Sequence, residues 1–264
     1  MLDTSVRKRA FEGVRNFRDF GGYAGSGGRR MASGRFFRSA HYALASDSDL
    51  QELAVLGIGA IVDLRRPFER ERSPSRRWPD FSAALVENHD NDEGAGSDSW
   101  DGFMADWDLS AEGIRTYHLR YYDRAPTLPR LHDLYGRYFR ALAASEGPVV
   151  VHCAAGKDRT GIICALTHTL AGVHRDDMIA DFLLTNDAAA FDIHAPVWAE
   201  EIAKQRGKAP SIATMHVMMG VHESYLDRAF TVIDERFGGF DRYLSEALGV
   251  DKALRAALEH KLFD

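Results

Sequence analysis

Short apolar runs separated by turn-forming residues organise the first half of the chain. Runs of this length, bounded by Gly, Pro, Asp or Asn, are typical of short β-strands. Four such strands are expected, at Arg35–Ser39, Ala60–Leu64, Ala83–Glu87 and Pro148–His152. Between the first two, Ser46–Leu56 opens on Ser-Asp-Ser-Asp and carries apolar residues at helical spacing, so a capped helix is expected there.

The second half of the chain has mainly helical patterns. Its apolar positions recur with the helical period of about 3.6 residues. The expected helices are Pro126–Ala144, Thr160–Leu170, Asp176–Thr185, His222–Phe237 and Asp251–Leu262. Strands with interposed helices, followed by a helical C-terminal half, predict an α/β domain with helices on both faces of a sheet.

Composition and charge exclude several classes of protein. With 45% hydrophobic and 27% charged residues, the chain has the composition of a globular protein, and its net charge of −6 argues against a general nucleic-acid binder. The longest apolar stretches fall short of the roughly 20 residues that a membrane span requires. The charged N-terminus lacks the apolar core of a signal peptide, and two cysteines suit a reducing compartment. We expect a cytoplasmic protein without a transmembrane segment, and export without a signal peptide stays open.

Two segments differ from the rest of the chain in charge. Arg65–Arg77 holds six arginines against two glutamates. A solvated face with local ion pairs is the ordinary interpretation, and contact with phosphoinositide headgroups or an anionic membrane is the alternative. Asp90–Asp108 holds seven acidic residues, no Lys or Arg, and several Gly and Ser, so it predicts a long surface loop.

The candidate catalytic segment spans residues 149–164. A β-branched strand ends at His152, a loop of small residues follows, and a helix is expected to begin near Arg159. Cys153 therefore lies just before a helix N-terminus, where partial positive charge favours a thiolate. A thiolate facing a bound phosphoryl group implies catalysis through a cysteinyl-phosphate. A buried cysteine unrelated to the arginine is the alternative, and the continuous order of His, Cys, small loop, Arg, Thr and Gly argues against it.

The loop after Cys153 has the composition of a phosphate-binding site. Small side chains let backbone N–H groups close around a tetrahedral oxyanion, and the Arg159 fork binds two of its oxygens. The expected phosphate-binding residues are Ala154, Ala155, Gly156, Lys157, Asp158 and Arg159. Lys157 adds a cation near the mouth of the site, which would favour substrates with more than one negative group. Thr160 could donate its hydroxyl to the sulfur, and His152 is expected to orient the loop.

The order His-Cys-Ala-Ala-Gly-Lys-Asp-Arg-Thr-Gly at 152–161 resembles the signature loop of cysteine-based protein tyrosine phosphatases, in the form of a bacterial branch of that family. Further similar motifs lie at 16–22, 34–39, 63–65 with Glu69, 181–187 and 220–226. The resemblance covers the chain from about residue 11 to its end, which implies one phosphatase domain over residues 1–264. It implies a phosphatase-like fold with a short, largely parallel sheet. It also implies a two-step hydrolysis without metal or cofactor, acting on phosphotyrosine, phosphoserine or phosphothreonine, or phosphoinositides.

Hydrolysis of this kind needs an acid that protonates the leaving oxygen. The resemblance places this acid in the acid-rich loop after the third strand, with Asp90 as the first candidate and Asp92 as the second. Asp158 in the phosphate loop is the third candidate, and its alternative role is to hold Arg18, Arg159 or another cation.

Other residues are expected to support the site. Asn16 and Arg18 are expected to brace the phosphate loop from behind, and Asp63 is either an anchor for the loop or a helix cap. Residues 188–220 predict either a helical lid or ordinary core-packing helices. Cys164 is expected to pack as a small apolar residue, and the spacing of the eleven His predicts no metal site.

The leading interpretation is a phosphatase whose partners are phosphorylated proteins or phosphoinositides. A phosphoinositide or inositol phosphate as the main substrate is the first alternative. A non-catalytic phosphate-binding module and a sulfurtransferase are weaker ones, because the former needs no thiolate and the Arg-Thr pair of the loop suits phosphate.

Overall fold

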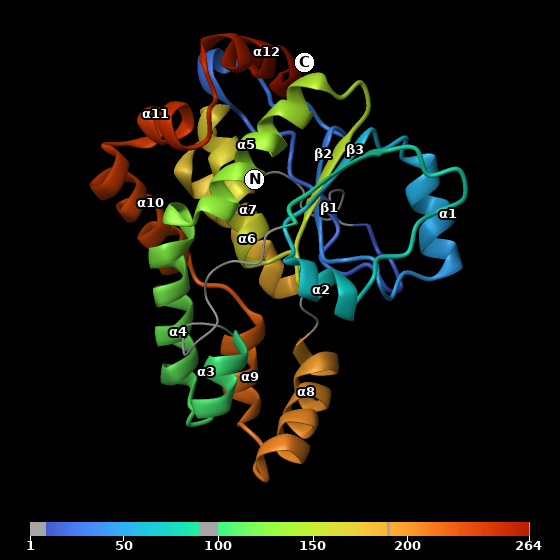
Figure 1. Ribbon diagram of the computed structural model, residues 1–264, viewed down its shortest axis with the longest axis vertical. Coiled ribbons are helices and arrows are strands. Elements are labelled where there is room, and N and C mark those ends of the chain that lie inside the picture. The colour runs from blue at the N-terminus through green and yellow to red at the C-terminus, as the bar shows by residue number, and fades with distance from the viewer. Residues whose placement is uncertain (1–8, 90–99, 189–190, 264) are drawn as a thin grey trace.

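The computed structural model describes residues 9–89, 100–188 and 191–263 of the 264-residue chain. Its centre is a five-stranded sheet in the order β1-β2-β5-β3-β4 (Figure 1). The strands are β1 (Arg18–Asp19), β2 (Phe36–Ser39), β3 (Ala60–Asp63), β4 (Ala84–Glu87) and β5 (Val149–His152). All neighbouring strands are parallel except β1, which pairs antiparallel with β2. The largely parallel α/β sheet is therefore confirmed, while the two-residue β1 is too short for an apolar pattern to reveal it.

The register of the sheet determines where a site can form. His152 at the end of β5 lies opposite Ser39 of β2 on one side and Asp63 of β3 on the other. Three strands therefore end at the same edge, and the loops that follow them converge there. In parallel sheets, ligands bind in the crevice outside these carboxyl ends.

Both faces of the sheet are buried. Alternate side chains of a strand point to opposite faces, and the strands follow this rule: Phe36, Ala60, Val62, Val149 and Val151 join the main core, and Phe37, Ile61 and Val150 join a second core. Two-sided burial explains why these strands are continuously apolar in sequence. Figure 1 shows α1 on one side of the sheet and α5 and α6 on the other, as the sequence predicts.

The helices expected from the sequence are present to within a few residues. They are α1 (Asp47–Val55), α5 (Pro129–Ala144), α6 (Asp158–Leu170), α7 (Arg175–Ala188), α10 (Glu223–Phe237) and α12 (Lys252–Leu262). Two short helices, α2 (Pro67–Arg72) and α11 (Phe240–Arg242), had no counterpart in the sequence-based expectation. Helix α1 begins at the expected cap, where the Ser46 and Asp49 side chains accept hydrogen bonds from each other's backbone N–H. Within the three described ranges, none of the helices combines the length and apolarity that a membrane crossing demands.

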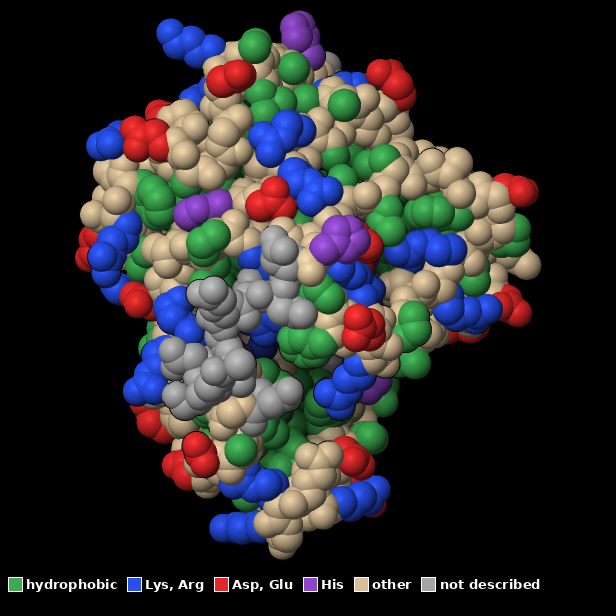
Figure 2. Space-filling model, viewed as in Figure 1, with side chains coloured by type: hydrophobic (Ala, Val, Ile, Leu, Met, Phe, Trp, Pro, Cys, Tyr) green, Lys and Arg blue, Asp and Glu red, His purple; other side chains and the backbone are tan. Residues whose placement is uncertain are grey.

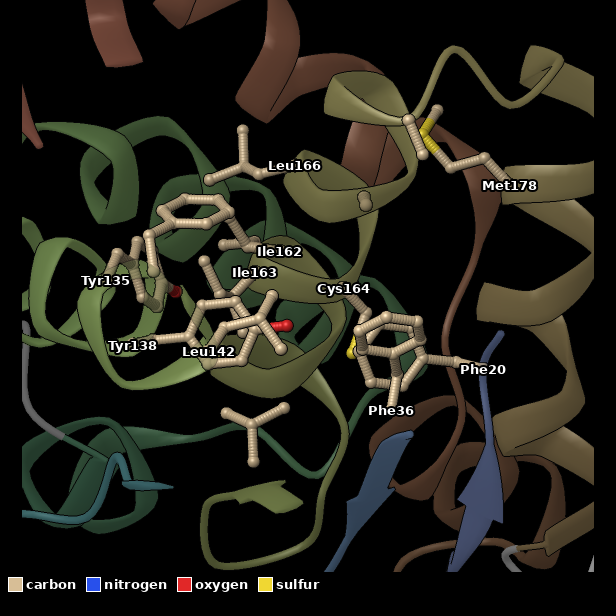
Figure 3. Packing of buried hydrophobic residues seen from close by; sticks show 14 of the residues in the cluster. Phe20, Phe36, Tyr135, Tyr138, Leu142, Ile162, Ile163, Cys164, Leu166 and Met178 are labelled. Atoms are coloured by element: carbon tan, nitrogen blue, oxygen red, sulfur yellow. The ribbon is translucent and has the colours of Figure 1, made fainter. Parts of the chain in front are cut away.

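Helix α6 anchors the loop that follows Cys153 because it is buried on nearly all sides. Figure 3 shows its Ile162, Ile163 and Leu166 beside Tyr135, Tyr138 and Leu142 of α5. On its other side, Cys164 lies against the rings of Phe20 and Phe36. A helix held in this way gives the loop at its N-terminus a rigid support.

Four helices form an outlying group below the sheet (Figure 1). They are α3 (Trp100–Asp106), α4 (Ala111–Arg124), α8 (Phe191–Arg206) and α9 (Ile212–Met219). Their buried residues make a third core that includes Trp107, Ile114, Ala199, Met215 and Met218. Figure 2 shows further hydrophobic side chains on the surface of this lower part of the molecule. Exposed apolar residues of α8 include Ile193, Val197 and Trp198.

The prediction of a surface loop over Asp90–Asp108 is wrong for the second part of this segment. Residues 100–106 form α3, and Trp107 is 3% exposed, whereas residues 90–99 lie outside the described ranges. The sequence analysis gave weight to the acidic residues and overlooked the aromatic ones. Trp100 and Phe103 pack on Tyr117 of α4. The sequence also gave no prediction for α4, because its buried positions carry few aliphatic residues.

Candidate active site

The loop between β5 and α6 presents Cys153 at the N-terminus of a buried helix. Cys153 is 2% exposed, and the helix begins at Asp158. Gly156 has a φ of +65°, and a Cβ on it would lie 2.3 Å from the Ser39 carbonyl oxygen. Only glycine suits this position, because the loop folds tightly over the end of β2. The sequence therefore builds a compact loop of small residues beside the thiol.

Arg159 is held in place by a carboxylate that pairs with it through two parallel contacts. Its Nη1 lies 2.5 Å from Glu69 Oε2, and its Nη2 lies 2.7 Å from Glu69 Oε1. Glu69 is itself fixed, since its Oε2 accepts a hydrogen bond from the backbone N–H of Arg66 at the start of α2. Burial opposes the charged form of Glu69, but attraction and hydrogen bonds from Arg159 outweigh it and lower the pKa of Glu69 to about 2. The guanidinium of Arg159 is thus held in a fixed orientation.

We expect Glu69→Gln to lower kcat/KM by roughly 10- to 100-fold, because the amide keeps one contact to Arg159 but loses the charged pair. The effect on stability depends on pH. Since the pKa of Glu69 is lowered from 4.5 to about 2, its contribution is full above pH 5 and is lost as the pH falls towards 2.

Urea unfolding of the wild type and of Glu69→Gln at several pH values measures this contribution. The difference in unfolding free energy should be constant above pH 5 and should shrink in acid. A difference that grows in acid, or a variant with wild-type kcat/KM, would contradict this role for Glu69.

Two side chains hold the loop by donating hydrogen bonds to the same carbonyl oxygen. Asn16 Nδ2 donates to the Gly156 carbonyl at 2.8 Å, and Arg38 Nη2 donates to the same oxygen at 3.0 Å. Arg18 in turn donates to Asn16 Oδ1. Two donors therefore fix this carbonyl on the side of the loop where Asn16 and Arg38 lie. Asn16 therefore contacts the loop directly, and Arg18 reaches it through Asn16.

Asp181 of α7 joins the two arginines behind the loop. It lies 3.2 Å from Arg18 Nε and 2.9 Å from Arg38 Nη1, and all three side chains are almost fully buried. Burial opposes its charge, but the two arginines prevail and hold the pKa of Asp181 well below its usual range. Sequence analysis missed Asp181 and Arg38 as supporting residues, although each lies within a motif noted for its resemblance to the family.

Asp181→Asn should cost about 3–5 kcal/mol of unfolding free energy, because two buried arginines then share no negative charge. Because the pKa of Asp181 is depressed, its contribution persists above the unfolded value and falls away as acid protonates it. Denaturant unfolding at pH 7 measures the cost. A loss within the uncertainty of the wild-type value would show that these contacts stabilise nothing.

Asp63 and His152 lie opposite each other at the ends of β3 and β5, where the loop begins. Asp63 pairs with Arg65, with 2.7 Å between Oδ2 and Nη2, and its other oxygen accepts from the Arg65 backbone N–H. His152 Nε2 lies 3.7 Å from Asp63 Oδ2. Burial lowers the pKa of His152 to about 4, although Asp63 opposes the shift. His152 is therefore neutral near pH 7 and adds no charge to the site.

Lys157 departs from its expected place at an open mouth. It is 6% exposed, and its Nζ donates to the Met218 carbonyl of α9 at 2.8 Å. The Nζ also lies 3.2 Å from His118 Nε2 of α4. Burial lowers the pKa of His118 to about 3, and the neighbouring lysine adds to the shift, so this imidazole is neutral. A residue of the phosphate loop is thereby joined to a helix of the segment 188–220.

Asp158 and Thr160 differ in how they are engaged. Asp158 accepts from the Tyr122 hydroxyl at 2.9 Å and lies 3.6 Å from Lys157 Nζ, so the cation beside it is Lys157, one of the other cations that the sequence analysis left open. Thr160 Oγ1 is buried and has no hydrogen-bond partner among the described residues. The expected donation to the sulfur is therefore not formed in this conformation.

The aspartates expected to act as the acid fall into two groups. Asp90 and Asp92 lie outside the described residues. Asp158 borders the loop and accepts from Tyr122 through one oxygen. A further aspartate, which sequence analysis did not consider, is Asp80 of Trp78-Pro79-Asp80. This tripeptide precedes the amino end of β4, at the edge of the sheet away from the phosphate loop.

Several arginines of the cluster Arg65–Arg77 are engaged in local contacts. Arg65 is buried and pairs with Asp63, Arg70 lies 3.5 Å from Glu87, and Arg76 lies 2.6 Å from Asp47.

Cys164 is buried in the main core, and burial raises the pKa of its thiol to about 12. Cys164 therefore remains a neutral thiol at physiological pH.

Comparison with known proteins agrees with this geometry. The sequence model described as "Tyrosine phosphatase family" matches residues 9–264. A Cupriavidus necator protein named as a tyrosine-protein phosphatase is 34% identical over 92% of this chain and 85% of its own length. The triple specificity protein phosphatase PtpB of Mycobacterium tuberculosis is 31% identical over 93% of this chain and 95% of its own length. The resemblance noted in the sequence is confirmed, and the chain belongs to the tyrosine phosphatase family.

Proposed function

We propose that this protein hydrolyses phosphotyrosine through a cysteinyl-phosphate on Cys153. The observation that carries the proposal is the pairing of a cysteine at the N-terminus of α6 with an arginine six residues later, whose fork Glu69 already orients. A thiol and a fixed guanidinium on either side of an anion-binding loop suit phosphoryl transfer, in which positioning and charge stabilisation supply most of the rate.

The first chemical step transfers the phosphoryl group to sulfur. The Cys153 thiolate attacks phosphorus, the S–P bond forms, and the bond from phosphorus to the leaving oxygen breaks. An acid gives that oxygen its proton, and Asp90, Asp92 and Asp158 are the candidates. Arg159 holds two phosphoryl oxygens while negative charge spreads over them.

The second step restores the thiolate. Water attacks the phosphorus of the cysteinyl-phosphate, the P–S bond breaks, and inorganic phosphate leaves. The proton of the water passes to the carboxylate that served as the acid. Asn16, Arg38 and Asp181 support both steps by keeping the Gly156 carbonyl away from the substrate.

The proposed substrate range extends to phosphoserine and phosphothreonine, since a relative is named a triple specificity protein phosphatase. Phosphoinositides are the alternative substrate. The cation expected to favour them, Lys157, is buried on Met218, so a substrate with a second phosphate would have to draw it away from α9.

Phosphate release in the presence of a chelator tests the proposal. A phosphotyrosine peptide, a phosphoserine peptide and a phosphatidylinositol phosphate are compared with the wild type and with Lys157→Ala. We expect the phosphotyrosine peptide to turn over fastest. Loss in Lys157→Ala that is confined to the lipid would instead identify the phosphoinositide as the true substrate, and absence of turnover on all three would overturn the proposal.

A further inference from the structure

The ammonium group of Lys157 is surrounded by three protein acceptors. Its Nζ lies 2.8 Å from the Met218 carbonyl oxygen, 3.2 Å from His118 Nε2 and 3.6 Å from Asp158 Oδ2. A lysine side chain carries three N–H donors and no acceptor. Two hydrogen bonds and one ion pair within the described part of the chain therefore engage all three donors. In this conformation Lys157 can contact a substrate only if it gives up one of these partners.

His118 is the acceptor that α4 provides, and it is buried. Because an ammonium group only donates, His118 Nε2 must accept, and the hydrogen of the neutral ring must lie on Nδ1. Nδ1 lies 3.4 Å from the Tyr225 hydroxyl of α10, whose oxygen can receive that hydrogen. Burial, together with the charge of Lys157, lowers the pKa of His118, which agrees with a neutral ring. The contact with Lys157 therefore specifies one form of this imidazole.

The helices that provide these acceptors are also held by contacts that do not involve the lysine. Ile114 of α4 and Met218 of α9 pack in the third core. Just after α9, the Val221 backbone N–H donates to Asn186 Oδ1 at 2.7 Å, and Asn186 Nδ2 donates to the Val221 carbonyl at 3.0 Å. A change of partner by the ammonium group therefore does not require α4 and α9 to separate.

The chemistry of Lys157 indicates which ligand competes for it. Lys157 directly follows Gly156 in the phosphate loop, and an ammonium group binds a phosphate as a point charge. We propose that His118 is a positioning residue, which accepts a hydrogen bond from Lys157 and thereby keeps this cation from a second phosphate of the substrate. The inference rests on the proposed function and concerns its selectivity. A substrate with one phosphate leaves Lys157 undisturbed, whereas a substrate with two gains its charge only by displacing it.

Two pairs of water-soluble substrates test this role on the full chain. One pair is a peptide with one phosphotyrosine and the same peptide with two adjacent ones, and the other is a short-chain phosphatidylinositol monophosphate and bisphosphate. Selectivity is the kcat/KM for the doubly phosphorylated member of a pair divided by that for the singly phosphorylated member. We expect His118→Leu to raise selectivity roughly tenfold, because one N–H of Lys157 then lacks its acceptor. The increase should disappear when His118→Leu is combined with Lys157→Ala.

Two further variants separate positioning from a loss of stability. His118→Gln keeps an acceptor, since its amide oxygen can replace Nε2, and it should restore the wild-type selectivity. His168→Leu is the matched control, because His168 is also buried and its Nε2 lies 2.7 Å from the Phe20 carbonyl oxygen in the main core. This substitution should lower the melting temperature and leave selectivity unchanged.

NMR of the histidine side-chain nitrogens in the wild type tests the same hydrogen bond without any substitution, and thus also if His118→Leu does not fold. At pH 7 the His118 ring should carry its hydrogen on Nδ1. A hydrogen on Nε2, or on both ring nitrogens, would show that Nε2 does not accept from Lys157 and would overturn the inference.

The kinetic outcomes are equally distinct. An increase in both substrate pairs supports the inference for a second phosphate in general, and an increase in one pair alone supports it for that source of the phosphate. Unchanged selectivity in His118→Leu, or an increase that persists without Lys157, would contradict it. An inactive wild type is a different result, since the proposed function itself would then fail.

Discussion

Cys153→Ser is expected to abolish turnover of a phosphotyrosine peptide, with a fall in kcat of roughly 10⁴- to 10⁶-fold. A serine hydroxyl at this position stays protonated, so it cannot attack phosphorus as a thiolate does. The loop, Arg159 and the helix N-terminus remain in place. Tungstate should therefore still bind to Cys153→Ser, with an affinity within about tenfold of the wild-type value.

The second cysteine provides the control. Cys164 is buried in the main core on α6, and its thiol stays protonated. Cys164→Ala should retain turnover while it removes a thiol from the same helix region. Equal losses in Cys153→Ser and Cys164→Ala, or a Cys153→Ser variant with wild-type turnover, would show that Cys153 is not the nucleophile.

Arg159→Lys should be nearly as damaging, with kcat/KM lowered roughly 10³- to 10⁴-fold. Its guanidinium contacts Glu69 through two nitrogens, and a planar fork of this kind can still reach two phosphoryl oxygens. A lysine ammonium is a single point charge, so it cannot hold Glu69 and two phosphoryl oxygens in fixed directions at once. Steady-state kinetics on an aryl phosphate measure the loss.

Arg242→Lys is the matched control for this substitution. Arg242 of α11 also pairs with a carboxylate through two nitrogens, with 3.0 Å from its Nε to Glu246 Oε1 and 3.2 Å from its Nη2 to Glu246 Oε2, and both side chains are exposed. The exchange there should change kcat/KM by less than about twofold, as for most surface substitutions. A loss below tenfold in Arg159→Lys would mean that charge alone suffices and that the fork geometry contributes little.

The sheet and the tight loop after β5 were predictable because each depends on residues that are neighbours in the sequence. Strands buried on both faces are continuously apolar, as Val149–His152 shows. The loop needs a nucleophile, small residues and an arginine in one continuous order. Gly156 illustrates the link, since its positive φ and the adjacent Ser39 carbonyl admit no side chain.

The support of the loop was less predictable because it depends on residues far apart in the chain. Arg18, Arg38 and Asp181 come from β1, β2 and α7, and no local pattern shows that one carboxylate serves both arginines. Glu69 lies in a six-residue helix of mainly charged composition, so its contact with Arg159 has no signature of its own. The direction of Lys157 towards α9 likewise depends on how the outlying helices pack.

Direct detection of phosphate on Cys153 tests the central claim. The wild type is mixed with a phosphotyrosine peptide in the presence of a chelator and quenched within a single turnover, and the Cys153 peptide is then analysed by mass spectrometry. We predict that the Cys153 peptide gains one phosphoryl group, transiently and in step with release of the dephosphorylated substrate peptide. No such peptide should appear with Cys153→Ser. Turnover without any phosphoryl group on the Cys153 peptide, or phosphate on another residue, would contradict the account.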